Sequence, residues 1–187
     1  MPHALFAMQQ SAPPSRPAPR LFPGVIPGSH VTRSGVGDAC ELGAARVPQV
    51  HDTRKQGLVT MLIQIAREKG VSAYVGEGAV RWAAGPLQDV ARLYRLAVEK
   101  TGPGVTIYHA VEEQGVSLRA IAESIGKGLK VPVTSISPDK AGEHFGPFGH
   151  FVQLDMPASS EWTRKILGWE PHGTGLIEDL NNMNYTQ

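Results

Sequence analysis

The sequence predicts an α/β fold that begins near residue 46 and is preceded by a segment of different composition. From Arg46 onward, apolar residues alternate between helical spacing and short runs rich in β-branched side chains, as in strands connected by helices. Residues 1–45 instead hold seven of the fifteen prolines and show no sustained period. We therefore expect a disordered, proline-rich tail at 1–45 and a folded part at 46–187.

The first elements of the folded part are expected between residues 55 and 82. Apolar residues at helical spacing predict a helix over 55–68, which Gly70 ends. A short strand follows over 71–75. Gly76 and Gly78 then predict a turn into a second short strand that ends near Trp82.

Helices and strands keep alternating beyond this turn. Pro86 is suited to the first turn of a helix with one apolar face, which ends at 102–104. A strand rich in β-branched and aromatic residues covers 105–111, and Ser117 caps a helix over 118–129. A further strand covers 131–136. This order predicts a parallel or mixed sheet.

The last fifty residues are expected to be mainly helical. Ser159 is positioned to cap a segment that Gly168 ends. Leu176, Ile177 and Leu180 form the last apolar face.

Composition argues against several classes of function. The net charge of +1 creates no overall field for nucleic acid or anionic lipid. No apolar run approaches the ~18–20 residues that span a bilayer. The single cysteine, Cys40, excludes an intramolecular disulfide and fits a reducing compartment such as the cytoplasm. The segment before Asp38 contains arginines and no acidic residue, which leaves an organelle transit peptide as the alternative.

An ordered series of segments resembles one known superfamily. It consists of R-V-P-Q-V-H-D at 46–52, G-x-G-x-x-R at 76–81, a helix start D-V-A at 89–91, the strand-helix-strand of 107–136, and the segment 159–169. The series resembles the extended and atypical short-chain dehydrogenases/reductases, the NAD-dependent epimerase/dehydratase-like group. It covers about three quarters of the chain. The resemblance implies a partial Rossmann-like fold, namely the C-terminal, substrate-side portion of such an enzyme.

The resemblance also implies roles for particular residues. Pro48, Val50 and His51 correspond to positions beside the nicotinamide of NAD(P), where an apolar side chain and backbone polar atoms suit the ring and its amide. Arg81, with Trp82 after it, corresponds to the substrate side, because an arginine there can form paired hydrogen bonds with a phosphate or carboxylate. The alternatives are a strand end that packs into a core and a solvated arginine.

Asp89, three residues into the expected helix after Pro86, has two readings. A carboxylate in the first turn of a helix is favoured by the positive end of the helix dipole. We therefore interpret Asp89 as a structural residue rather than a catalytic one.

No catalytic residue is predicted, because two motifs of that superfamily are not found. None of the four tyrosines has a lysine four residues later, so the Tyr-x-x-x-Lys pair that moves the proton is missing. G-V-G-D-A-C at 35–40 has a cysteine where the phosphate-binding loop needs its third glycine. The resemblance thus predicts an NAD(P)-dependent oxidoreductase or epimerase of a small-molecule substrate, with this chain truncated and inactive alone.

Two other classes of function remain open. A metal site could draw on His109, Glu112, His144 and His150, but no H-E-x-x-H or C-x-x-C spacing occurs, and no metal is expected. The chain could instead be a non-catalytic binding or assembly module derived from such an enzyme. An exposed core left by missing strands would then favour a homo-oligomer or a partner chain.

Overall fold

The computed structural model describes residues 30–34, 41–100 and 104–186. Most of the predicted tail at 1–45 lies outside these ranges, and so do the 35–40 segment and the expected helix end at 102–103. The described parts of 1–45 belong to strands β1 (His30–Ser34) and β2 (Glu41–Arg46). For the residues of 1–45 outside these two strands, the tail stays a prediction.

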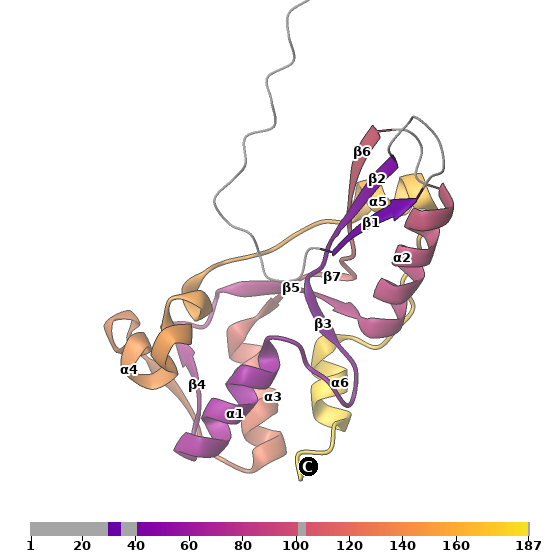
Figure 1. Cartoon of the computed structure of the whole chain (residues 1–187). Helices are drawn as coiled ribbons and strands as arrows, with labels where there is room; N and C mark the ends of the chain where they lie inside the picture. Colours follow the sequence, from indigo (N-terminus) through magenta and orange to yellow (C-terminus); the bar gives the residue numbers. More distant parts are fainter. Residues whose placement is uncertain (1–29, 35–40, 101–103, 187) are drawn as a thin grey trace, which may run out of the picture.

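The first sheet has the order β1-β2-β6, with β6 spanning Gly104–His109. β1 is antiparallel to β2, and β2 is parallel to β6. Helices α2 (Leu87–Lys100) and α5 (Glu161–Leu167) lie beside this sheet (Figure 1). Apolar residues from α2, α5, β2 and β6 form one hydrophobic core, and we call this part of the molecule the smaller lobe.

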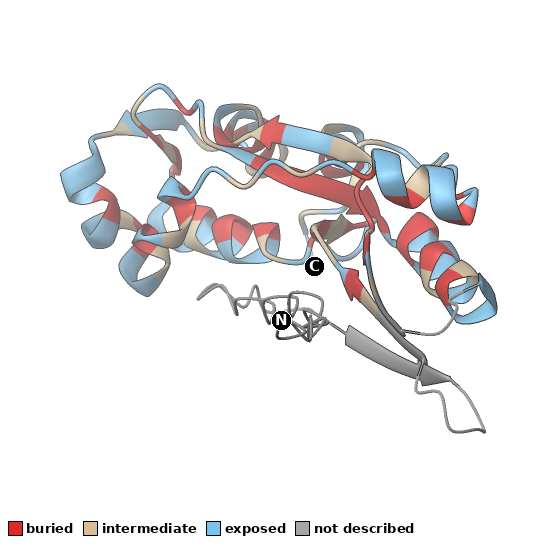
Figure 2. Cartoon of the chain, turned by 90° about the horizontal axis from the view of Figure 1, so that it is seen from above, coloured by how far each residue is buried: buried red, intermediate tan, exposed pale blue. Residues whose placement is uncertain are grey.

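The second sheet crosses the middle of the molecule (Figure 2). Its order is β3-β5-β7, with β3 spanning Gln49–His51, β5 spanning Arg81–Pro86 and β7 spanning Glu113–Ser117. β3 is parallel to β5, and β7 is antiparallel to it. β5 is the central strand of this order, and all of its residues except Arg81 are buried. Its neighbour β7 was not predicted, since E-Q-G-V-S has little β-branched content.

The third sheet pairs β4 (Ser72–Val75) with β8 (Val133–Ile136) in parallel. This pairing corrects the expected strand-turn-strand unit around Gly76 and Gly78. β4 and β5 are consecutive in the chain, but they belong to different sheets. The turn therefore carries the chain from one sheet to another.

Helices pack around the β4-β8 sheet and form the larger lobe with it (Figure 1). The helical elements of this lobe are α1 (Val59–Lys69), α3 (Leu118–Leu129), η1 (Pro138–Lys140), α4 (Ala141–Phe145), η2 (Gly146–Gly149), η3 (Phe151–Gln153) and α6 (Leu176–Asn182). The largest hydrophobic core of the described residues lies here. No helix in the described ranges has the length and apolar character needed to cross a membrane.

Several predicted helix ends have the expected local geometry. The Oγ of Ser117 accepts a hydrogen bond from the backbone N of Ala120 at 3.2 Å, so Ser117 is the N-cap of α3. α1 ends at Gly70 and α5 ends at Gly168, both with positive φ as expected for a glycine that follows a helix. The residue that precedes α5 is Ser160, and the Oγ of the predicted Ser159 accepts the hydrogen bond from the N–H of Glu161 at 3.2 Å.

Candidate functional site

A pocket of about 670 Å³ lies where the chain passes from the first sheet to the second. Its walls come from the connection between β2 and β3, from the start of β5, from the end of β6 and from residues 156–158. Its volume falls within the range of small-molecule sites, about 300–1,000 Å³. It is therefore the candidate site of the described structure.

The segment 156–158 is fixed to the second sheet by backbone hydrogen bonds. The N–H of Met156 donates to the Arg81 carbonyl at 2.8 Å, and the N–H of Ala83 donates to the Met156 carbonyl at 3.1 Å. The N–H of Ala158 donates to the Gln114 carbonyl at 3.0 Å. This wall of the pocket is thus an extension of the sheet rather than a free loop.

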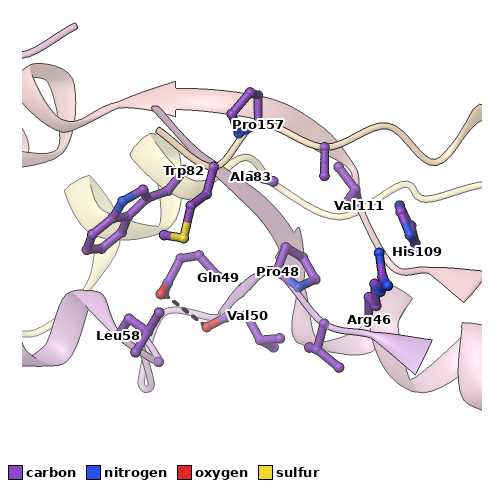
Figure 3. Close-up of a pocket in the computed structure, with 14 residues that line it drawn as sticks. Arg46, Pro48, Gln49, Val50, Leu58, Trp82, Ala83, His109, Val111 and Pro157 are labelled. Atoms are coloured by element: carbon purple, nitrogen blue, oxygen red, sulfur yellow. Dashed lines mark hydrogen bonds between the residues drawn. The ribbon is translucent and has the colours of Figure 1, made fainter. Parts of the chain in front are cut away.

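Gln49 has its amide committed to the backbone of the neighbouring loop. Its Nε2 donates to the Val50 carbonyl (Figure 3) and to the Gln56 carbonyl. Its Oε1 accepts from the N–H of Val59. The side chain is buried although it lines the pocket. Gly57 has a φ of +50°, and a Cβ there would lie 2.8 Å from the Val50 carbonyl oxygen, so this turn requires glycine.

The polar end of the pocket carries Arg46 and His109. These residues pair with each other at the carboxyl ends of the parallel strands β2 and β6. Ligands of α/β proteins commonly bind at this edge of a parallel sheet. The Nδ1 of His109 lies 3.1 Å from the Ser159 carbonyl. Because a carbonyl only accepts, Nδ1 carries the proton of the neutral ring and Nε2 is the other, unprotonated nitrogen.

The opposite end of the pocket is apolar. Figure 3 shows Trp82 and Leu58 at this end, away from Arg46 and His109. Trp82 is 1% exposed, and its ring makes edge-to-face contacts with Phe148 and Phe151 at centroid distances of 6.0 and 5.4 Å. Such contacts fix the orientation of the indole ring. The pocket therefore has a rigid aromatic wall.

The residues predicted beside a nicotinamide separate in the structure. Pro48 and Val50 line the pocket. His51 is not among the lining residues. Its side chain is buried, and its Nδ1 lies 2.7 Å from Oδ2 of Asp179 in α6. Their cofactor role stays a prediction.

Of the two residues predicted on the substrate side, only Trp82 lines the pocket. Arg81 lies outside it and forms an ion pair with Asp155, with its Nη2 2.8 Å from Oδ2. The hydrogen bond from Arg81 holds the pKa of Asp155 below its usual range. Both side chains are about half exposed. The substrate role predicted for Arg81 and Trp82 stays a prediction.

The glycine turn before Arg81 serves helix packing. Gly78 has a φ of +67°, and a Cβ there would lie 2.5 Å from Cβ of Arg119 in α3. The close approach thus involves a helix of the larger lobe.

Asp89 has the structural role expected for it, in a form that the sequence did not indicate. Its Oδ2 accepts hydrogen bonds from the backbone N–H of His172 at 2.9 Å and of Gly173 at 2.7 Å. Its Oδ1 accepts from Nη2 of Arg92 at 2.8 Å. The carboxylate is buried and attaches the loop after α5 to the start of α2.

The four residues considered for a metal site do not form one. Within 30–34, 41–100 and 104–186, no group of three or more His, Cys, Asp or Glu side chains could hold a metal ion. Glu112 is instead a partly buried carboxyl whose pKa is raised, first by burial and then by the charge of Glu113.

Several lining residues were not predicted from the sequence. Leu58, Met156 and Pro157 lie far from one another in the chain, and no motif joins them. Arg46 and His109 had one usable signal, since each ends a strand and parallel strands bring their carboxyl ends to one edge.

Comparison with known proteins gives two kinds of match. No model of a known protein family matches the chain. The uncharacterized protein C2A9.02 of Schizosaccharomyces pombe is 45% identical over 138 residues, which cover 74% of this chain and 46% of that protein. The uncharacterized protein YLL056C of Saccharomyces cerevisiae is 46% identical over 142 residues, covering 75% and 47% respectively. The chain thus spans about half the length of the curated relatives it matches.

Solved structures show the fold. MoeE5 in complex with UDP-glucuronic acid and NAD matches with a TM-score of 0.53 and 17% identity, covering 75% of this chain and 45% of that one. ADP-L-glycero-D-manno-heptose-6-epimerase of Helicobacter pylori matches with 0.52 and 18%, covering 74% and 41%. The dTDP-glucose 4,6-dehydratase DesIV of Streptomyces venezuelae, with NAD bound, matches with 0.53 and 16%, covering 73% and 41%.

These matches confirm, at the level of fold, the resemblance that the sequence indicated. The mixed α/β architecture and its Rossmann-like neighbours agree with the predicted fold class. About three quarters of the chain has the fold of a portion of the extended short-chain dehydrogenases/reductases, the NAD-dependent epimerases and dehydratases.

Proposed function

We propose that the chain provides the substrate side of an NAD(P)-dependent oxidoreductase or epimerase site. The observation that carries this proposal is the pocket at the carboxyl ends of parallel strands, in a chain that shares its fold with NAD-dependent epimerases and dehydratases. The parent reaction is hydride transfer between a nicotinamide and a carbinol or carbonyl carbon. In this proposal, the reacting carbon of the substrate lies in the pocket.

The described residues fit one end of the cofactor. Pro48 and Val50 present apolar atoms to the pocket, which suits the face of a planar ring. A pyrophosphate needs backbone donors at a glycine loop that opens a helix. Gly57 lines the pocket just before α1. The side chain of Gln49 binds the backbone on both sides of this glycine, at Gln56 and Val59, so the turn does not form a glycine loop that could bind a pyrophosphate. NAD(P), when bound, supplies or takes the hydride.

The chain's own contribution is to position the substrate and exclude water. Trp82 and the 156–158 segment form fixed walls, and Gln49 holds the loop between β3 and α1 in place. A fixed, apolar site keeps a reacting carbonyl oriented and strengthens the electrostatic interactions inside it. No residue of the chain is assigned the proton transfer.

Nucleotide binding tests this proposal. The purified chain and the full-length S. cerevisiae relative are titrated with NADH and NADPH, and nucleotide fluorescence is followed. We expect saturable binding at micromolar concentration by the relative and not by this chain. The chain would lack several charge-assisted hydrogen bonds to the pyrophosphate, each worth about 1.5–3 kcal/mol. If the relative binds neither nucleotide, the proposal is refuted. If this chain binds a nucleotide at micromolar concentration, the prediction that it is inactive on its own is refuted.

A non-catalytic binding or assembly module is the second candidate, and one observation favours it. Trp162 and Ile166 stand one turn apart on α5 and are 53% and 51% exposed. Two large apolar side chains at this spacing form a face that another chain could cover. Light scattering after size exclusion distinguishes the candidates. A stable dimer that Trp162→Ser dissociates favours the module, whereas a monomer leaves the enzyme proposal alone.

A further inference from the structure

The body of the pocket offers few polar groups to a ligand. Apart from Arg46 and His109 at one end, its lining side chains are apolar, with Gln49 as the exception. The amide of Gln49 already binds three backbone groups, at Gln56, Val50 and Val59. A pocket that binds many hydroxyl groups needs side chains to pair with them, because unpaired polar groups are costly to bury. This pocket therefore suits a ligand with an apolar body.

The polar end of the pocket has the opposite character. Arg46 is exposed and forms no ion pair with any residue whose side chain the structure describes. Among the described residues that line the pocket, none is an aspartate or a glutamate. His109 is next to Arg46 in the parallel register, and its Nδ1 is already bonded to Ser159. A guanidinium beside an imidazole, with no carboxylate among the described residues of the pocket, attracts an anionic group.

Arg81 provides the contrast within the same molecule. It lies outside the pocket, and Asp155 neutralises it through two side-chain hydrogen bonds, at 3.2 and 2.8 Å. An arginine held in this way has little charge left to offer a ligand. The cationic group available to the pocket is therefore Arg46 and not the arginine that the glycine motif singled out.

We propose that the pocket binds an apolar organic anion, with its carboxylate or similar group at Arg46 and His109 and its apolar body extending to Trp82. This inference rests on the proposed function for its chemistry, since the substrate would be an apolar carbonyl or carbinol compound that carries one anionic group. It distinguishes the ligand from a sugar nucleotide, whose many hydroxyl groups would find no partners along the apolar walls.

A matched pair of fluorescent probes tests the inference without any cofactor. 8-Anilinonaphthalene-1-sulfonate carries one anionic group, and N-phenyl-1-naphthylamine has the same aromatic body without it. Both are titrated into the purified full chain. We expect the anionic probe to bind about tenfold more tightly, as one charge-assisted pair provides. Arg46→Gln should remove most of this preference and leave the affinity of the neutral probe unchanged.

Two variants control for the position of the effect. Arg81→Gln removes an exposed arginine outside the pocket, so both affinities should stay as in the unchanged protein. Ala158→Trp places a large side chain on the pocket wall and should weaken both probes. Circular dichroism of each variant confirms that the fold is kept.

Three outcomes would overturn the inference. They are equal affinity for the two probes, loss of the anionic preference in Arg81→Gln, and an Arg46→Gln variant that keeps the preference. Because no nucleotide is present, these outcomes are distinct from the failure of the proposed enzyme function, which the NADH titration of the full-length relative reports. If the chain prefers the anionic probe but the relative binds no nucleotide, the anion site is supported and the proposed enzyme function is refuted.

Discussion

The two lobes of the molecule are stabilised in different ways. In the larger lobe, α1, α3 and α6 pack apolar residues against the β4-β8 sheet and the centre of β5. Among the residues whose burial is described, the smaller lobe has fewer buried apolar ones, and α5, with seven residues, is its second helix. There, buried or partly buried side chains bind backbone groups. Asp89 holds the loop after α5, and Nζ of Lys100 donates to the Leu167 carbonyl at 2.7 Å.

The smaller lobe shows how a short helix, α5, is held against a small sheet. A helix of seven residues has little apolar area to bury, and short helices are marginal without tertiary contacts. Hydrogen bonds between side chains and backbone supply the missing contacts at specific points. Thr163 of α5 accepts from the His109 N–H at 2.8 Å, so the same contact that docks α5 also positions a pocket residue. The larger lobe also contains such contacts, since the Oγ of Ser72 donates to the Ala122 carbonyl at 2.8 Å and the Leu176 N–H at the start of α6 donates to Oε2 of Glu113 at 2.7 Å. Its helices pack in addition on a larger apolar core.

The largest expected effect comes from cavities in the two cores. Ile121 in the larger lobe and Leu93 in the smaller lobe are both fully buried. We expect Ile121→Ala and Leu93→Ala each to lower the free energy of unfolding by about 2–5 kcal/mol. Both variants should unfold in one transition with urea, because β5 contacts elements of both lobes. A second, earlier transition in Leu93→Ala alone would show that the smaller lobe unfolds independently.

A smaller and more local effect is expected from Asp89→Ala. The change leaves the N–H groups of His172 and Gly173 without their acceptor, which costs about 1–3 kcal/mol. Hydrogen exchange should rise at residues 169–173 and remain unchanged in α3. Asp89→Asn, which keeps an acceptor oxygen, should lose less. Equal exchange across both lobes in Asp89→Ala would contradict the local role of this carboxylate.

The smallest effect is expected at the exposed pair of Arg81 and Asp155. The hydrogen bond from Arg81 lowers the pKa of Asp155, so the folded protein binds a proton there less readily than the unfolded chain does. The pair therefore stabilises the fold above the ordinary carboxyl pKa of 3.8, and this contribution is lost as the pH falls through the lowered value. The melting temperatures of Asp155→Asn and the unchanged protein should differ slightly at pH 7 and converge in acid. If the difference between the two melting temperatures becomes larger in acid, the pair does not stabilise the fold through the ionised form of Asp155.

Much of the local structure follows from short-range rules. The period of apolar residues predicted α1, α2, α3 and α6, and the caps at Ser117 and Gly70 lie where side-chain and backbone chemistry requires them. The resemblance to the short-chain dehydrogenases/reductases predicted the fold, which the structural neighbours confirm. It also selected Pro48, Val50 and Trp82, which the structure brings into one pocket.

Contacts between distant residues could not be predicted in the same way. Arg81 finds Asp155 and His51 finds Asp179 across separations of 74 and 128 residues, and nothing local to either residue specifies these partners. The strand after Gly78, β5, pairs with β3 and β7, whereas its chain neighbour β4 pairs with β8. These contacts remove Arg81 and His51 from the pocket.

The helices, most of their ends and the α/β class could be predicted, because they depend on spacing and on residues a few positions apart. The site depends on pairing between distant parts of the chain. The register of β2 with β6 places Arg46 beside His109, and the pairing of residue 156 with β5 closes the wall of the pocket. The physical reason is that a pocket is formed by surfaces that meet only after strands from distant parts of the chain have paired.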